Sequence, residues 1–189
     1  MNICIYGASS NAIDPFYLEQ AEKLGKAMAQ HKHSLVFGGG STGLMGAAAR
    51  GAAFGKGKLF GVAPHFFNHD GILFDQCTEL ILTDTMRQRK QKMEELSDAF
   101  LVLPGGIGTF EEFFEILTLK QLHRHWKPIV IWNLKNYYAP LIRMLEHTVD
   151  ENFMKSACME MYQVFTDLES MLAYLENYHE TMPKDQDLR

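Results

Sequence analysis

Short apolar runs alternate along the chain with longer stretches in which apolar residues recur every three or four positions. Such runs are typical of buried strands, and such stretches are typical of amphipathic helices. The runs predict strands at 2–6, 34–37, 58–63, 78–82, 99–103 and 129–132, with a short edge strand at 161–165. The stretches predict helices at 16–30, 85–96, 113–122, 137–149 and 167–178, and a helix of small residues after Gly43. This alternation predicts an α/β fold of three layers, a mainly parallel sheet with helices on both faces.

The chain has 189 residues, 47% of them apolar, which is enough to bury one sizeable core. No repeat or linker divides it, so we expect a single domain over residues 1–180. The segment 181–189 is polar, and we expect it to form a flexible tail.

Charge is distributed unevenly along the chain. The formal net charge of −5 argues against general nucleic-acid binding. Residues 23–69 contain no Asp or Glu, but they contain four histidines and the basic residues Lys23, Lys26, Lys32, Arg50, Lys56 and Lys58. A basic region within an acidic protein suits a small anionic ligand.

Several classes of protein are not indicated. No apolar run approaches the roughly 20 residues of a membrane span, and no signal peptide is recognisable. Cys4, Cys77 and Cys158 form no C-x-x-C pair, so we expect reduced thiols and a cytoplasmic protein. The histidines show no metal-ligand spacing, and the absence of G-x-S-x-G argues against a hydrolase triad.

Three turns rich in glycine or serine follow predicted strands. They are Gly7-Ala8-Ser9-Ser10, the run 38–43, and Pro104-Gly105-Gly106-Ile107-Gly108-Thr109. Ligands of parallel sheets bind at the carboxyl ends of the strands, so we expect the three turns to open on one edge. The turn at 104–109 also precedes a helix N-terminus, which favours an anion such as phosphate.

The run Gly38-Gly39-Gly40-Ser41-Thr42-Gly43 matches G-x-G-x-x-G. A dinucleotide site requires an acidic residue about 20 positions later, and residues 23–69 contain none. Contact with the phosphate of another nucleotide is favoured instead. The simpler alternative is that Ser41 or Thr42 caps the next helix.

Arg89 is predicted to lie in the middle of an apolar helix face formed by Met86, Met93 and Leu96, with Lys90 at the margin of that face. An unpaired buried charge costs several kcal/mol, so Arg89 needs a carboxylate or a ligand. A core ion pair and a side chain that reaches out to water are the structural alternatives.

Thr109-Phe110-Glu111-Glu112 matches the capping box S/T-x-x-E, with Thr109 as N-cap and Glu112 at N3. Glu112 then either satisfies only a backbone N–H or stands beside the sugar of a bound nucleotide. We expect Phe110, Phe113, Phe114 and Leu117 to be core residues.

Together these motifs resemble those of the LOG ("Lonely Guy") family. The matching segments are Gly38-Gly39-Gly40 with Gly43-Leu44-Met45-Gly46, then Met86-x-x-Arg89-Lys90-x-x-Met93, then Pro104-Gly105-Gly106-x-Gly108-Thr109-x-x-Glu112. Members of this family have often been labelled lysine decarboxylases. No pyridoxal-binding lysine motif stands out here, so the residues do not support that label.

The resemblance implies a Rossmann-like fold, a homodimer, and hydrolysis of the N-glycosidic bond of a purine nucleoside 5'-monophosphate. It implies Arg89 and Glu112 as the catalytic pair and Gly105, Gly106, Gly108 and Thr109 as the phosphate site. The convergent turns and the basic helix add Ser9, Gly39, Gly40 and Lys90 as candidates for substrate binding. No metal or redox cofactor is needed.

Two questions stay open from the residues alone. The substrate is AMP or an N6-prenyl-AMP cytokinin precursor. The alternative to catalysis is a carrier or sensor of a nucleotide or of the molybdenum cofactor on the same fold. The complete Arg89 and Glu112 pair favours catalysis.

Overall fold

The described strands form one parallel sheet, as the alternation of elements predicts. This computed structural model describes residues 1–69 and 71–179, and the predicted tail at 181–189 lies outside them. The strands are β1 (Asn2–Tyr6), β2 (Ser34–Phe37), β3 (Leu59–Pro64), β4 (Glu79–Thr83), β5 (Ala99–Val102), β6 (Ile129–Trp132) and β7 (Gln163–Phe165). Their order in this seven-stranded sheet is β4-β3-β2-β1-β5-β6-β7, and each neighbouring pair is parallel.

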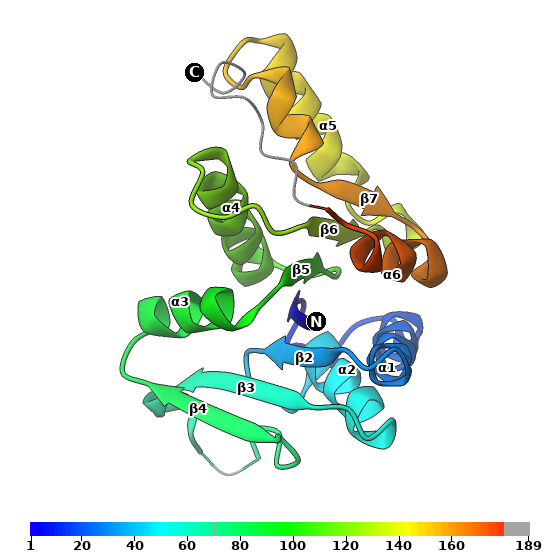
Figure 1. The fold of residues 1–189 in the computed structure, drawn as a ribbon, viewed down its shortest axis with the longest axis vertical. Coiled ribbons are helices and arrows are strands. Elements are labelled where there is room, and N and C mark those ends of the chain that lie inside the picture. The colour runs from blue at the N-terminus through cyan, green and yellow to red at the C-terminus, as the bar shows by residue number, and fades with distance from the viewer. Residues whose placement is uncertain (70, 180–189) are drawn as a thin grey trace.

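The strand order reverses between β1 and β5. From β1 the chain moves outward through β2, β3 and β4, then returns to pair β5 with the free side of β1 (Figure 1). Tyr6 at the end of β1 lies opposite Val102 at the end of β5. The turns after these two strands therefore flank the switch point, where open α/β sheets bind their ligands.

Helices cover both faces of the sheet. The α-helices are α1 (Pro15–Gln30), α2 (Gly43–Phe54), α3 (Met86–Leu96), α4 (Ile107–Gln121), α5 (Ala139–Asp150) and α6 (Leu168–Glu176). Alternate residues of each strand point to opposite faces. Ile3 and Ile5 therefore pack with α1, α2 and α6, whereas Cys4 and Tyr6 pack with α3, α4 and α5. Figure 1 shows α3 and α4 on one side of the central strands and α1 and α2 on the other.

The predicted capping box at Thr109 is wrong. Helix α4 begins at Ile107 with Gly106 as N-cap, so Thr109 is the third helical residue and Glu112 lies a turn further in. The chain does contain a capping box, at the start of α3, where the Thr85 side chain accepts from the Gln88 N–H and the Gln88 side chain accepts from the Thr85 N–H. The sequence signature alone does not say where a helix begins.

A further expectation, about one side chain, is wrong. Phe114, expected in the core, is exposed on α4, whereas Phe113 and Leu117 are buried.

Within residues 1–69 and 71–179, none of the helices has the length and apolar character needed to cross a bilayer.

Candidate active site

One cavity of about 640 Å³ lies at the carboxyl edge of the sheet, over the switch point. The loop after β1, the loop after β2 and the start of α4 all line it, so the three predicted turns do open on one edge. Its polar lining includes Ser9, Arg89 and Glu112. Its apolar lining includes Met45, Phe67, Ile72, Leu73 and Met86.

Arg89 and Glu112 form a buried ion pair at the floor of this cavity. Nη1 of Arg89 on α3 donates to Oε1 of Glu112 on α4 over 2.9 Å. Only 5% of Arg89 and 9% of Glu112 is exposed. Arg89 Nε also donates to the carbonyl of Val62 over 3.2 Å, which fixes the guanidinium from a second side. The alternative in which Arg89 reaches out to water is therefore wrong.

Burial controls the chemistry of Glu112. Loss of solvent raises the pKa of its carboxyl group, and the adjacent Arg89 guanidinium opposes that rise. The result is a carboxylate that is poorly hydrated and binds a proton more readily than an ordinary glutamate. Such a group is suited to accept a proton or to stabilise a nearby positive charge.

Gly38 makes room for the Arg89 guanidinium. A Cβ atom at position 38 would lie 2.1 Å from Nη2 of Arg89, far inside any allowed contact. The first glycine of the run 38–43 therefore leaves space for the ion pair, and it also lines the cavity. A G-x-G-x-x-G pattern contains no signal for that role.

The loop after β5 is anchored by two tyrosines that the sequence analysis did not single out. Tyr137 donates its hydroxyl to the Gly105 carbonyl over 2.7 Å, and Tyr138 donates to the Leu103 carbonyl over 2.6 Å. A Cβ at Gly105 would lie 2.1 Å from Thr109 Oγ1, so only glycine fits between the loop and α4. Both tyrosines are more than 30 residues away along the chain, and no local pattern indicates them.

The two helix N-termini near the cavity differ in what their N–H groups do. At α2, the Gly43 N–H donates to Asn11 Oδ1 and the Leu44 N–H donates to the Ala8 carbonyl. At α4, no side chain of the described residues caps the N-terminus, and Gly106, Ile107, Gly108 and Thr109 line the cavity. The first N–H groups of a helix have no partner within it and attract anions. The start of α4 is therefore the better anion site.

Only some of the predicted site residues line the cavity. Ser9, Gly40, Arg89, Gly106, Gly108, Thr109 and Glu112 line the cavity. Gly39, Gly105 and Lys90 are not among the described residues that line it. Gly105 instead lines a smaller neighbouring hollow with Tyr17 and Tyr137. Lys90 pairs with Glu111 and, over 2.9 Å, with Glu115, because its place on the helix turns it toward the outer side of α4.

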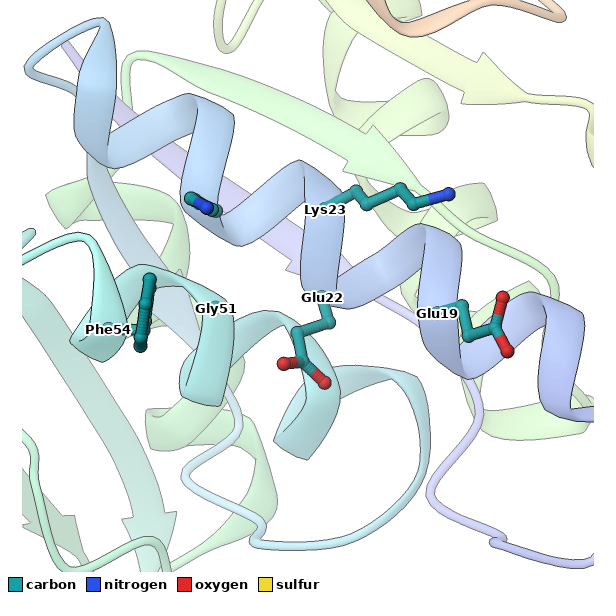
Figure 2. Close-up of a pocket in the computed structure, with 6 residues that line it drawn as sticks. Glu19, Glu22, Lys23, Gly51 and Phe54 are labelled. Atoms are coloured by element: carbon teal, nitrogen blue, oxygen red, sulfur yellow. The ribbon is translucent and has the colours of Figure 1, made fainter.

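A second hollow, of about 320 Å³, lies between α1 and α2. Figure 2 shows the charged ends of Glu19, Glu22 and Lys23 pointing in different directions rather than toward one point. Phe54 of α2 lies at its edge. This hollow has no converging polar set comparable with the cavity at the carboxyl edge.

The sheet order defines a Rossmann-like α/β protein, with a cavity and a buried ion pair at its switch point. Residues 45–175 match the family described as "Possible lysine decarboxylase". The cytokinin riboside 5'-monophosphate phosphoribohydrolase of Rhodococcoides fascians is 41% identical over 167 residues, which cover 85% of this chain and 82% of that protein. The Arabidopsis thaliana enzyme of the same name, LOG2, is 34% identical over 185 residues, covering 98% of this chain and 85% of that one. The chain therefore belongs to the LOG family of phosphoribohydrolases.

A solved structure shares the fold. The Moco carrier protein of Chlamydomonas reinhardtii superposes with a TM-score of 0.69 at 24% identity, over 93% of this chain and 94% of that chain. At this identity the likeness concerns the fold alone.

Proposed function

We propose that this protein hydrolyses the N-glycosidic bond of a purine nucleoside 5'-monophosphate, releasing the free base and ribose 5-phosphate. The observation that carries the proposal is the Arg89–Glu112 ion pair, buried yet open to a cavity beside a helix N-terminus. Relatives at 34–41% identity over most of their length are named for this reaction on cytokinin riboside 5'-monophosphates.

The 5'-phosphate binds at the start of α4, where the N–H groups of Ile107, Gly108 and Thr109 and the helix dipole favour an anion. Holding the phosphate positions the sugar and converts binding energy into orientation. Ser9 and Gly40 face the same space from the other two loops.

Glu112 acts on the ribose. As the C–N bond breaks, its electron pair leaves with the base, and positive charge develops on the sugar ring. The carboxylate of Glu112 stabilises that charge and takes one proton of the water that attacks C1'. That proton passes to the departing base, so one water molecule is added across the C–N bond. Arg89 keeps the buried carboxylate in place and compensates its charge. The reaction consumes only water, and no metal or redox cofactor takes part.

The base lies against the apolar lining of Met45, Phe67, Ile72, Leu73 and Met86. An apolar wall accommodates both adenine and an adenine with an N6-prenyl group. The substrate is thus AMP or N6-prenyl-AMP, with no role for nucleic acid or membrane.

The test is incubation of the protein with AMP and, separately, with isopentenyladenosine monophosphate, followed by chromatography for the free base. Release of base with an equal amount of ribose 5-phosphate supports the proposal. Tight nucleotide binding without turnover of either substrate would contradict it and would favour a carrier.

We also propose that the protein is a cytoplasmic homodimer. Ile107 is 85% exposed, and Met86, Phe67 and Phe114 are exposed as well. All but Phe114 line the cavity, so an apolar surface surrounds its mouth, and burial against a second copy would remove it from water. Light scattering coupled to size exclusion tests this, and a monomer mass at micromolar concentration would contradict it.

A further inference from the structure

Three potential metal ligands meet at the edge of the sheet opposite the cavity. His31 caps the C-terminus of α1, His33 directly precedes β2, and Glu176 is the last residue of α6. His31 Nδ1 lies 2.7 Å and His33 Nε2 lies 2.9 Å from Oε1 of Glu176. The three ligand atoms all lie within 4.8 Å of one another, and they are the only such set found among the described residues.

The turn between the two histidines is held in one conformation. Lys32 has a φ of 60°, in the left-handed region that a residue with a side chain seldom adopts. The Lys32 N–H donates to the Ala29 carbonyl over 3.0 Å, and the His33 N–H donates to the Met28 carbonyl over 2.8 Å. These bonds place both imidazoles on the same side, with ring centroids 6.1 Å apart. A fixed pair of imidazoles loses little entropy when it binds a metal ion.

The hydrogen bonds converge in a way that suits metal binding. Nδ1 of His31 and Nε2 of His33 both lie within hydrogen-bond distance of the same oxygen, Oε1 of Glu176. The other ring nitrogen of His33, Nδ1, lies 3.4 Å from the amino group of Met1, which orients the ring.

We propose that His31, His33 and Glu176 bind Zn²⁺, with water as the fourth ligand. Two imidazoles and one carboxylate are ligands that Zn²⁺ prefers, in a tetrahedron with Zn–N and Zn–O near 2.0–2.2 Å. Such a tetrahedron separates its ligand atoms by about 3.3 Å, so each contact between a histidine and Glu176 needs to open by about 0.5 Å. The two ring nitrogens, which lie within 4.8 Å of each other, need to take up the same separation. His31 and Glu176 are partly exposed, which gives the ion a path from solvent.

This site acts on the fold and not on the reaction. It ties α6 to the turn between α1 and β2, which are more than 140 residues apart in the sequence. Met171, Leu172 and Leu175 of α6 belong to the core on that face, so holding the end of α6 protects their packing. A ligand that binds only the folded state raises the melting temperature.

The experiment is calorimetric titration of the untagged protein with ZnSO₄, together with thermal melts. Wild type should bind one Zn²⁺ and melt about 5 °C higher at 100-fold excess over Kd. His31→Ala and Glu176→Gln should each bind at least about 10-fold more weakly and, at the same zinc concentration, keep at most about half of the shift. His147→Ala, which removes an exposed histidine of α5, should behave as wild type.

Three results would overturn the proposal. They are an unchanged wild-type melting temperature with Zn²⁺, an unaltered affinity in both His31→Ala and Glu176→Gln, or an equal shift with Mg²⁺, which avoids imidazole ligands. Melts without zinc show whether each variant is folded. Because the ion is remote from the cavity, the outcome is independent of the hydrolysis assay.

Discussion

Glu112 Oε1 accepts a hydrogen bond from Arg89 Nη1 over 2.9 Å, in a place where both side chains are almost fully buried. The two residues come from different helices on one face of the sheet, at the strand switch point. A charge pair in such a place costs desolvation energy that a purely apolar contact would avoid. The pair lines an open cavity, where its charges can act on a ligand, and this geometry leads to the following predictions.

Replacement of Glu112 by Gln should lower kcat by about 10²- to 10⁴-fold, because the amide neither accepts a proton nor stabilises a cation. The substitution also leaves Arg89 buried without a counter-charge, so the melting temperature should fall. Steady-state release of base, assayed well below that temperature, measures the effect. Glu111→Gln is the matched control, since Glu111 is exposed and pairs with Lys90 outside the cavity; a similar loss there would argue against a special role for Glu112.

Replacement of Gly38 by Ala should displace the Arg89 guanidinium and so weaken its ion pair with Glu112. The new Cβ would lie 2.1 Å from Arg89 Nη2, so the guanidinium must move and its contacts with Glu112 and Val62 are lost. We expect a fall in melting temperature and at least about a 10-fold loss of kcat/KM. Gly40→Ala, where a Cβ meets nothing within 4 Å, should keep the wild-type melting temperature. Equal melting temperatures for the two variants would refute this reason for glycine at position 38.

Replacement of Tyr137 by Phe removes the hydrogen bond to the Gly105 carbonyl and frees the loop that precedes α4. Because that loop positions the phosphate site, KM should rise several-fold, with a smaller change in kcat. Tyr17→Phe is a suitable comparison, since Tyr17 packs edge-on against Tyr137. The interpretation fails if KM is unchanged in Tyr137→Phe or rises equally in both variants.

The dependence of kcat/KM on pH should report Glu112. Burial raises the pKa of this carboxyl, so the active carboxylate is lost on acidification at a pH above the usual range of a glutamate. Activity should therefore increase as pH rises through that raised pKa. The substrate phosphate also titrates, near pH 6. In Glu112→Gln, the pH dependence of the residual kcat/KM reports the titration of the substrate phosphate alone. If wild type shows the same pH dependence as this variant, Glu112 does not titrate in the reaction.

Short-range patterns predicted much of this molecule correctly. The six longer strands and the edge strand lie within one or two residues of the predicted bounds at most ends, because apolar runs between turn residues leave few alternatives to a buried strand. The position of Arg89 on an apolar helix face was also predictable from a local pattern, because helical periodicity places it on the same face as Met93.

Contacts between distant segments decided the rest. Thr85-x-x-Gln88 and Thr109-x-x-Glu112 carry the same signature, yet only the first is a capping box, because α4 starts earlier, at Ile107. The partners of Lys90 come from another helix and turn it away from the cavity. The spacing of residues in the sequence also gave no indication that Tyr137 bonds to the loop after β5 or that Glu176 lies beside His33.

The sequence by itself determined the α/β class, the edge of the sheet where the three turns meet, and the place of Arg89 on an apolar helix face, because each depends on a period or a turn within about 15 residues. Glu112 was indicated by a capping-box signature that α4 does not form and by the family resemblance. Only the tertiary structure decided that Arg89 and Glu112 share a bond, that Gly38 gives the guanidinium its space, and that α4 rather than α2 offers its N–H groups. Those facts depend on how separate helices approach one another, which the packing of the whole core sets and no local pattern encodes.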